Sequence, residues 1–249
     1  MEISFKGQLA FVTGGTRGIG AAVARGILDS GGKVVITGTG GDRPDWAGGL
    51  PSGMKDSVHY YRLDFLEPGW EGALDGIVER HPDISVCVNN AGINIISDIR
   101  RVKMDDLDKV LRVDLAAPAM VISRVSGQMA KNGYGRIVNI SSIFGIKSRA
   151  ERSSYSAAKA GLIGQTRGAA LDLAAEGVLV NAVAPGFVET DLTKKILGEK
   201  GMKEIIGRIP VGRMASPEDI VPAVLFLASG LNTYITGQVL TADGGFIIG

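Results

Sequence analysis

The sequence predicts an α/β fold in which a parallel sheet is covered by helices on both faces, the doubly wound arrangement. Along its 249 residues, short continuous apolar runs alternate with segments of helical pattern, and such runs are typical of parallel strands buried on both faces. A glycine-rich turn joins the first apolar run to the first helix. No linker-like break or repeat divides the chain, so we expect one domain of residues 1–249 with about seven strands.

The amino-terminal half alternates regularly between strand and helix. The pattern predicts strands near 8–13, 33–37, 57–63 and 84–88, and helices near 18–29 and 68–80. A helix would be expected after the second strand, but residues 40–53 are rich in glycine and proline. Because both residues disfavour a helix interior, we expect a loop or a very short helix there.

The carboxyl-terminal half continues the alternation. It predicts helices near 103–131, 154–176 and 216–228, and strands near 135–141, 178–184 and 238–242. Ligands of doubly wound sheets lie beyond the carboxyl ends of the strands. Gly14, Asn90, Ser142 and Pro185 all fall at such ends, so we expect them to converge in space.

Composition excludes some partners and suggests a compartment. The formal net charge of +1 gives no electrostatic case for nucleic acid or for an anionic membrane surface. The single cysteine, Cys87, excludes an internal disulfide and fits a reducing cytosol. The first residues lack a signal-peptide pattern, and no apolar run approaches the ~20 residues of a membrane span. We therefore expect a cytoplasmic protein.

Tyr155 and Lys159 lie four residues apart in a helical pattern, so both side chains share one face, one turn apart. A free tyrosine, with a pKa near ~10, is a poor base at neutral pH. A unit charge ~5 Å away, at an effective dielectric of ~20, contributes about 3 kcal/mol, roughly two pK units. We expect Lys159 to lower the pKa of Tyr155 toward the range of a general acid/base. The alternative is an ordinary exposed helix pair.

The segment Thr13-Gly-Gly-Thr-Arg-Gly-Ile-Gly20 separates the first strand from the first helix. Its glycines, Gly14, Gly18 and Gly20, allow a tight turn and a close approach of the backbone to a pyrophosphate. The helix that follows offers free N–H groups and a partial positive charge to the anion. The spacing is G-x-x-x-G-x-G, unlike the G-x-G-x-x-G of other dinucleotide-binding folds.

Two further motifs complete a recognisable set. Ser142 ends a strand thirteen residues before Tyr155, and Asn89-Asn-Ala-Gly92 directly follows the fourth apolar run. With Pro185-Gly-Phe-Val-Glu-Thr190, these motifs closely resemble the short-chain dehydrogenase/reductase family, from Lys6 to Gly249. The pattern looks most like that of 3-oxoacyl-acyl-carrier-protein reductases. The resemblance implies a Rossmann-type fold and an NAD(P)-dependent enzyme.

The resemblance also implies a mechanism. NADPH would deliver hydride to a ketone while Tyr155 protonates the oxygen, Ser142 orients that oxygen, and Lys159 lowers the tyrosine pKa and binds the nicotinamide ribose. The family usually adds an asparagine whose backbone carbonyl helps to hold a proton-relay water, and here that position is Asp114. If only the carbonyl matters, Asp114 can substitute. If the amide matters, the relay is altered, and the added negative charge near Lys159 could shift the behaviour of that lysine. We keep Asp114 as a fourth candidate catalytic residue.

Cofactor contacts follow from the same resemblance. Asp64 would accept a hydrogen bond from the adenine amino group; the alternative is that it only caps the strand end. Residues 90–92 would line the ribose and diphosphate. Residues 185–190 would cover the nicotinamide carboxamide. The expected contacts are Gly14, Thr16, Arg17, Gly18, Ile19, Gly20, Thr39, Asp64, Phe65, Asn90, Ala91, Gly92, Tyr155, Lys159, Pro185, Gly186, Val188 and Thr190.

Cofactor preference depends on the end of the second strand. NAD-preferring relatives place an acid there, which binds the ribose hydroxyls and repels a 2′-phosphate. Here the position is Gly38, followed by Thr39, while Arg17 can reach a 2′-phosphate and Arg43 can assist. Asp42 could instead reach the ribose from a flexible loop. We expect NADP(H) to be preferred, with NAD(H) possible.

The substrate is less well defined by the sequence. We favour a small keto, sugar-like or cyclic molecule. The alternatives are 3-oxoacyl-acyl-carrier-protein reduction, NAD-dependent sugar or polyol oxidation, a silent NADP sensor, and epimerase or dehydratase chemistry. Carrier-dependent relatives place docking arginines at the ends of two helices, where this chain has Glu176 and, in partial compensation, Lys131 and Arg167.

Three basic residues, Lys147, Arg149 and Arg152, lie between Ser142 and Tyr155. They indicate either an anionic or phosphorylated substrate or merely solvated charges.

The resemblance further implies a homotetramer, with a dimer as the alternative. The last strand and the two long helices would form the subunit interfaces. A mobile substrate lid is expected near residues 190–210, where Phe187, Ile196 and Met202 would contribute apolar side chains; the alternative is that these three are core residues.

Overall fold

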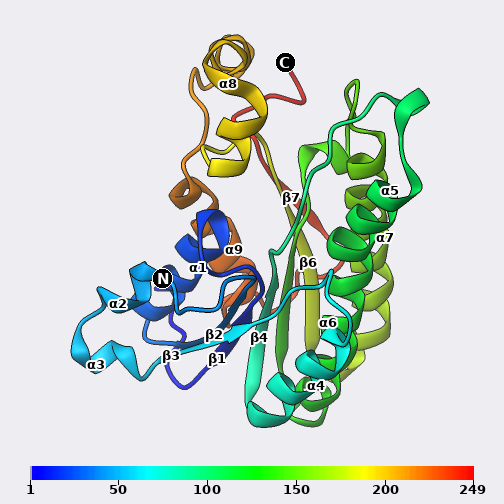
Figure 1. Cartoon of the computed structure of the whole chain (residues 1–249). Helices are drawn as coiled ribbons and strands as arrows, with labels where there is room; N and C mark the ends of the chain where they lie inside the picture. The colour runs from blue at the N-terminus through cyan, green and yellow to red at the C-terminus, as the bar shows by residue number, and fades with distance from the viewer. Residues whose placement is uncertain (1) are drawn as a thin grey trace.

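The computed structural model describes residues 2–249, apart from the side chains of Ser52, Leu192, Lys194, Lys195 and Ile196. Seven parallel strands form one sheet in the order β3-β2-β1-β4-β5-β6-β7 (Figure 1). This confirms the predicted fold class. The strands are β1 Leu9–Val12, β2 Lys33–Gly38, β3 Val58–Arg62, β4 Ile84–Asn89, β5 Gly135–Ile140, β6 Val178–Pro185 and β7 Val239–Ala242.

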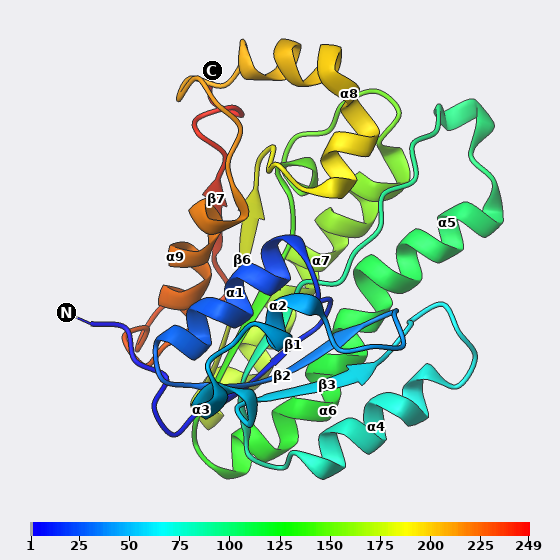
Figure 2. The ribbon, with the colours of Figure 1, turned by 60° about the vertical axis from the view of Figure 1, so that its left-hand side comes forward.

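Helices cover both faces of the sheet because side chains alternate along each strand. In β1, Ala10 and Val12 belong to the apolar core beneath helices α1 (Gly18–Asp29) and α9 (Pro217–Ala228). Leu9 and Phe11 face the second core. That core lies beneath α4 Trp70–Arg80, α6 Ala117–Lys131 and α7 Ser153–Leu173 (Figures 1 and 2).

The strand order reverses between β1 and β4, which are neighbours in the sheet. Strands β1 to β3 proceed toward one edge, and β4 to β7 proceed toward the other. In open α/β sheets such a reversal opens a crevice beyond the carboxyl ends of the two strands. The loops after β1 and β4 carry the glycine-rich turn and the Asn-Asn-Ala-Gly motif, so both motifs meet at this crevice.

The predicted helix near 103–131 is interrupted. It consists of α5 (Met104–Leu111), a π turn (Arg112–Ala116) and α6. A π turn widens the backbone ring locally and often marks a functional site. The glycine-rich region after β2 contains only two short helices, α2 (Asp45–Gly48) and α3 (Ser52–Lys55), as expected.

Helix α8 (Asp191–Ile206) was not predicted as a helix, although it occupies the expected lid region. Its sequence has little amphipathic pattern, and Gly198 has non-helical backbone angles inside it (φ 62°). It lies above the carboxyl ends of the strands (Figure 1). Phe187 and Met202 contribute to a small apolar cluster there; the side chain of Ile196 lies outside the described residues. In the described part of the chain, no helix has the length and apolar character to cross a membrane.

Candidate active site

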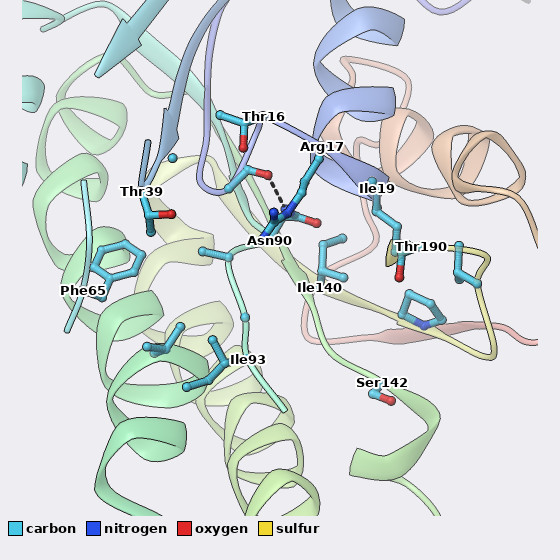
Figure 3. A pocket seen from close by; sticks show the side chains of 18 of the residues that line it. Thr16, Arg17, Ile19, Thr39, Phe65, Asn90, Ile93, Ile140, Ser142 and Thr190 are labelled. Carbon is cyan, nitrogen blue, oxygen red and sulfur yellow. Dashed lines mark hydrogen bonds between the residues drawn. The ribbon is translucent and has the colours of Figure 1, made fainter. Parts of the chain in front are cut away.

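A cavity of about 430 Å³ opens at the crevice between the carboxyl ends of the strands. Figure 3 shows Thr39 and Phe65 on one side of it, Arg17 and Asn90 in the middle, and Ser142 and Thr190 on the other side. Every residue expected to contact the cofactor lines this cavity except Gly20, and Ser142 lines it as well. Of the site residues that the sequence predicts, only Gly20 and Asp114 are therefore absent from the lining.

Asn90 braces the glycine-rich turn. Its side-chain amide donates hydrogen bonds to the carbonyl oxygens of Thr13 and Gly14, both at 3.0 Å. The Thr13 hydroxyl accepts hydrogen bonds from the backbone N–H groups of Asn90 and Ala91, at 3.0 and 3.1 Å. Gly14 has a φ of 65°, a region that favours glycine. A Cβ at Gly20 would come within 2.3 Å of the Gly14 oxygen, so Gly20 supports the turn by close packing.

The end of β2 packs tightly against the glycine-rich turn, so a side chain at position 38 would require Thr16 to move. A Cβ at Gly38 would lie 2.4 Å from Cγ2 of Thr16. Arg17, in contrast, is exposed and lines the cavity. The expectation that Arg43 assists is not met, because its guanidinium donates a 2.9 Å hydrogen bond to the Lys55 carbonyl oxygen and it does not line the cavity.

Two acidic residues considered for the adenosine side differ in position. Asp42 is exposed and does not line the cavity. Asp64 lines it, and its Oδ1 also accepts a 2.9 Å hydrogen bond from the backbone N–H of Leu66. Asp64 thus shapes the turn after β3 while facing the cavity.

Ser142, Tyr155 and Lys159 meet at the other side of the cavity. Ser142 follows β5, and its hydroxyl oxygen accepts a 3.1 Å hydrogen bond from the backbone N–H of Phe144. Tyr155 and Lys159 come from the first two turns of α7, as their spacing predicts. The Lys159 Nζ lies 5.6 Å from the centre of the Tyr155 ring and donates a 3.0 Å hydrogen bond to the Ile140 carbonyl oxygen.

Asp114 contacts Lys159 directly. The carboxylate lies in the π turn, is completely buried, and places Oδ1 3.0 Å from the Lys159 Nζ. Its Oδ2 accepts a 3.1 Å hydrogen bond from the backbone N–H of Ile93. A Cβ at Gly92 would come within 2.7 Å of Oδ1, so only glycine leaves space for this pair. The side chain of Asp114 is thus engaged, whereas the resemblance drew attention mainly to its backbone carbonyl.

Burial dominates the electrostatics of Tyr155. It raises the pKa of Tyr155 above its ordinary value, and the negative charge of Asp114 adds to that rise. Lys159 and a hydrogen bond from Ser142 lower the pKa of Tyr155, but by less. The expected net lowering by Lys159 is therefore not met in this structure. Burial also raises the pKa of Asp114, against the effect of Lys159. Burial alone would lower the pKa of Lys159. Asp114 and Tyr155 together outweigh that effect, so the pKa of Lys159 is raised.

The cavity also includes residues that the sequence analysis did not select. Most of them are neighbours in the sequence of a predicted motif residue at a strand end, and this proximity could have identified them. Asp191 and Thr193 belong to α8, which the sequence did not indicate as a helix. The additional lining residues are Thr37, Gly38, Leu63, Leu66, Ile93, Val113, Ile140, Ser141, Asp191 and Thr193. Among the described residues, no three His, Cys, Asp or Glu side chains are grouped so as to hold a metal ion.

Comparisons with known proteins agree with this arrangement. The family model described as "Enoyl-(Acyl carrier protein) reductase" matches residues 14–247. The chain is 41% identical to the 3-oxoacyl-[acyl-carrier-protein] reductase FabG of Aquifex aeolicus, over 98% of this chain and 99% of that protein. It is 36% identical to the protein of the same name from Thermotoga maritima, over 98% and 99%.

Solved structures extend the comparison. A putative NAD(P)-dependent gluconate 5-dehydrogenase from Beutenbergia cavernae superposes with a TM-score of 0.91 at 33% identity, covering 99% of each chain. A gluconate 5-dehydrogenase from Burkholderia cenocepacia, in complex with NADP and tartrate, gives 0.89 at 30% identity, covering 99% of this chain and 98% of that one. These matches, with the Ser142, Tyr155 and Lys159 constellation, confirm the resemblance and indicate an NAD(P)-dependent oxidoreductase acting on CH–OH and C=O groups. The chain belongs to the short-chain dehydrogenase/reductase family.

Proposed function

We propose that the protein reduces a ketone, or oxidises the corresponding secondary alcohol, of a small-molecule substrate with NADP(H). The observation that carries this proposal is the position of Ser142, Tyr155 and Lys159 at the cavity whose other wall is the glycine-rich turn. NADP(H) fits the residues present: Arg17 is available for a 2′-phosphate, and position 38, where an acid would repel that phosphate, is a glycine. Several solved relatives contain bound NADP, among them the structures from Beutenbergia cavernae and Burkholderia cenocepacia described above.

The bound cofactor would supply or accept the hydride. The Ser142 hydroxyl donates a hydrogen bond to the substrate oxygen and holds it beside Tyr155. In reduction, Tyr155 passes its phenolic proton to that oxygen, and its high pKa keeps the proton available at neutral pH. In oxidation, Tyr155 removes the proton. Lys159 stabilises the tyrosinate, and Asp114 holds Lys159 in position.

The test is ketone reduction by Tyr155→Phe with NADPH. We expect the rate to fall by at least about a hundredfold, because the general acid is lost, while NADPH binding changes little. Tyr134→Phe is the matched control, because Tyr134 lies before β5 and does not line the cavity. A Tyr155→Phe protein that reduces the ketone at the unmodified rate would overturn the proposal.

A second candidate is 3-oxoacyl-acyl-carrier-protein reduction, which the 41% identity to the Aquifex aeolicus protein favours. The expected carrier-docking stretches, 131–134 and 174–177, adjoin one another through a hydrogen bond between Gly135 N–H and the Gly177 oxygen. These stretches precede β5 and β6 and therefore lie at the amino ends of the strands. Ser142 follows β5 and lies at the carboxyl ends, on the opposite side of the molecule. Glu176 adds a charge that repels an acidic carrier.

A carrier protein bound at the amino ends of the strands would therefore deliver its acyl group to the active site of a neighbouring copy. Comparing kcat/KM for a 3-oxoacyl thioester on its carrier and for small free ketones separates the two candidates. A carrier-bound substrate preferred by about a hundredfold would establish the second candidate, and equal or better use of free ketones would exclude it.

We further propose a single cytoplasmic domain that assembles as a homotetramer, with a dimer as the alternative. Large apolar side chains are exposed on two of the three elements expected to form interfaces. Leu171 of α7 is 83% exposed, and Leu240 of β7 is 43% exposed. Such side chains favour contact with a second copy. Sedimentation of the purified protein measures the assembly.

A further inference from the structure

Arg152 is a buried cation whose guanidinium is incompletely paired. It lies at the start of α7, three residues before Tyr155 and on the same helical face. Only 6% of Arg152 is exposed. Its Nη1 donates a 3.2 Å hydrogen bond to the Glu151 carbonyl oxygen, and its buried Nε has no hydrogen-bond partner. A guanidinium is always charged and presents five N–H donors. The Nε–H of Arg152 is therefore a donor without an acceptor.

No carboxylate of the described residues forms an ion pair with Arg152. Burial lowers the pKa of Arg152, and the positive charge of Arg149 lowers it further, against the smaller effects of Glu151 and Tyr155. A buried charge without a counter-ion costs free energy. An anion that contacts Arg152 would offset that cost and satisfy the Nε–H group.

The segments beside Arg152 carry further unpaired polar atoms. The Ser97 N–H donates a 3.3 Å hydrogen bond to the Glu151 oxygen, which joins the loop after β4 to the start of α7. Asn94 Oδ1 in that loop and the Ser153 hydroxyl are buried without partners. The adjoining Ile93 lines the cavity.

Glu151 holds the local backbone in an uncommon conformation. It is the one non-glycine residue with a positive φ (64°) among residues 2–249. Strain of this kind is found mainly at ligand-binding and catalytic positions. It immediately precedes Arg152, so the strained turn fixes where α7 begins and where the guanidinium lies.

We propose that Arg152 is an anchor for an oxyanion of the substrate, a carboxylate or a phosphate, held about one helical turn from Tyr155, which binds the substrate carbonyl together with Ser142. The unpaired Ser153 hydroxyl would donate a second hydrogen bond, and the unpaired Asn94 Oδ1 would accept one from a neighbouring substrate hydroxyl. The substrate class is then a hydroxylated keto acid or keto phosphate. This inference rests on the proposed ketone chemistry at the cavity that Ser142 and Tyr155 line; Arg152, Ser153 and Asn94 are not part of that lining, but they adjoin it in the chain through Tyr155 and Ile93.

The experiment measures anion binding to NADP⁺-saturated protein by calorimetry and by the thermal unfolding midpoint, at constant ionic strength. The probes are tartrate, its uncharged four-carbon counterpart threitol, and inorganic phosphate. Saturation with NADP⁺ blocks the cofactor's own phosphate-binding positions, so phosphate reports on the substrate region. We expect tartrate or phosphate, but not threitol, to bind and stabilise the unmodified protein.

Arg152→Gln should weaken that binding by about tenfold or more, because a charge-assisted hydrogen bond is lost. Arg152→Lys should restore part of it by retaining the charge, which excludes misfolding as the cause. Arg167→Gln is the matched control, since Arg167 is exposed on the same helix, and it should bind the anion normally.

Equal anion binding by all variants, equal binding of threitol and tartrate, or no binding of either anion would overturn the inference. Binding of phosphate without tartrate, lost in Arg152→Gln, would identify a phosphorylated substrate. Binding of tartrate alone would identify a carboxylate. Ketone reduction by the same preparation is measured separately, so an inactive protein with Arg152-dependent anion binding would contradict the proposed function and leave the anion site intact.

Discussion

The Nζ of Lys159 lies 3.0 Å from a carboxylate oxygen of Asp114, and both side chains are almost completely buried. This ion pair joins the π turn between α5 and α6 to the second turn of α7. The hydrogen bond from Lys159 to the Ile140 oxygen extends the connection to the end of β5. An asparagine would supply no counter-charge here, so the electrostatic surroundings of Tyr155 differ from those that the family pattern implies.

Asp114→Asn should shift the pH dependence of alcohol oxidation to lower pH. The negative charge of Asp114 raises the pKa of Tyr155, so a neutral amide allows the tyrosine to lose its proton at lower pH. Oxidation requires the tyrosinate, and the rising limb of kcat/KM against pH should move down by about one pH unit. The measurement is the rate of NADP⁺ reduction across a pH series. Asp108→Asn, on the exposed side of α5, should leave the profile unchanged.

If the rising limb of kcat/KM against pH stays in place in Asp114→Asn, the Asp114 charge does not act on Tyr155. If that limb moves to higher pH, the sign of the interaction is wrong. Because the substitution also removes the counter-ion of a buried lysine, the unfolding midpoint should fall as well.

Gly92→Ala should impair catalysis while leaving the fold intact. The added Cβ would lie 2.7 Å from Oδ1 of Asp114 and 3.5 Å from Nζ of Lys159, so the ion pair must move. Small displacements of catalytic groups are costly, and we expect kcat to fall by about tenfold or more. Gly164→Ala in α7, where nothing lies within 4 Å of the added atom, is the control. Unchanged kcat in Gly92→Ala would contradict the assigned position of the pair.

The strands, most helices and the convergence of the motifs could be predicted because they depend on local patterns. Continuous apolar runs define β1 and β4, and the spacing of Tyr155 and Lys159 places them on one face of α7. The π turn and the Asp114–Lys159 pair depend on packing between distant segments. The sequence of α8 has little amphipathic period and is interrupted by Gly198, so its pattern does not indicate a helix.

The direction of the Tyr155 pKa was also beyond the sequence. Spacing gives the approximate separation of Tyr155 and Lys159, but it gives neither the extent of burial nor the opposing charge of Asp114. Likewise, the Arg43 contact with Lys55 depends on the folded course of residues 40–55.

Arg17→Ala should weaken NADPH binding selectively. Arg17 is exposed at the cavity, where its guanidinium can pair with a 2′-phosphate that NADH lacks. We expect the Kd for NADPH to rise by about tenfold or more and the Kd for NADH to change little. Fluorescence titration with both cofactors measures this, with Arg25→Ala of α1 as the control. Preference for NADH in the unmodified protein would instead assign the ribose to an acid such as Asp42.

Gly38→Asp alone should weaken both cofactors, because its Cβ would lie 2.4 Å from Cγ2 of Thr16 and displace the glycine-rich turn. Adding Thr16→Ala removes that methyl group and leaves the Thr16 Cβ, which lies at an ordinary contact distance of 3.4 Å. The new carboxylate can then accept hydrogen bonds from the ribose hydroxyls and repel a 2′-phosphate. We expect the double variant to prefer NADH, with the ratio of the two Kd values shifted by about a hundredfold, whereas Thr16→Ala alone keeps the NADPH preference. Titration of all three variants measures the ratios. A single Gly38→Asp variant that already binds NADH tightly would show that Thr16 does not limit the space at the end of β2.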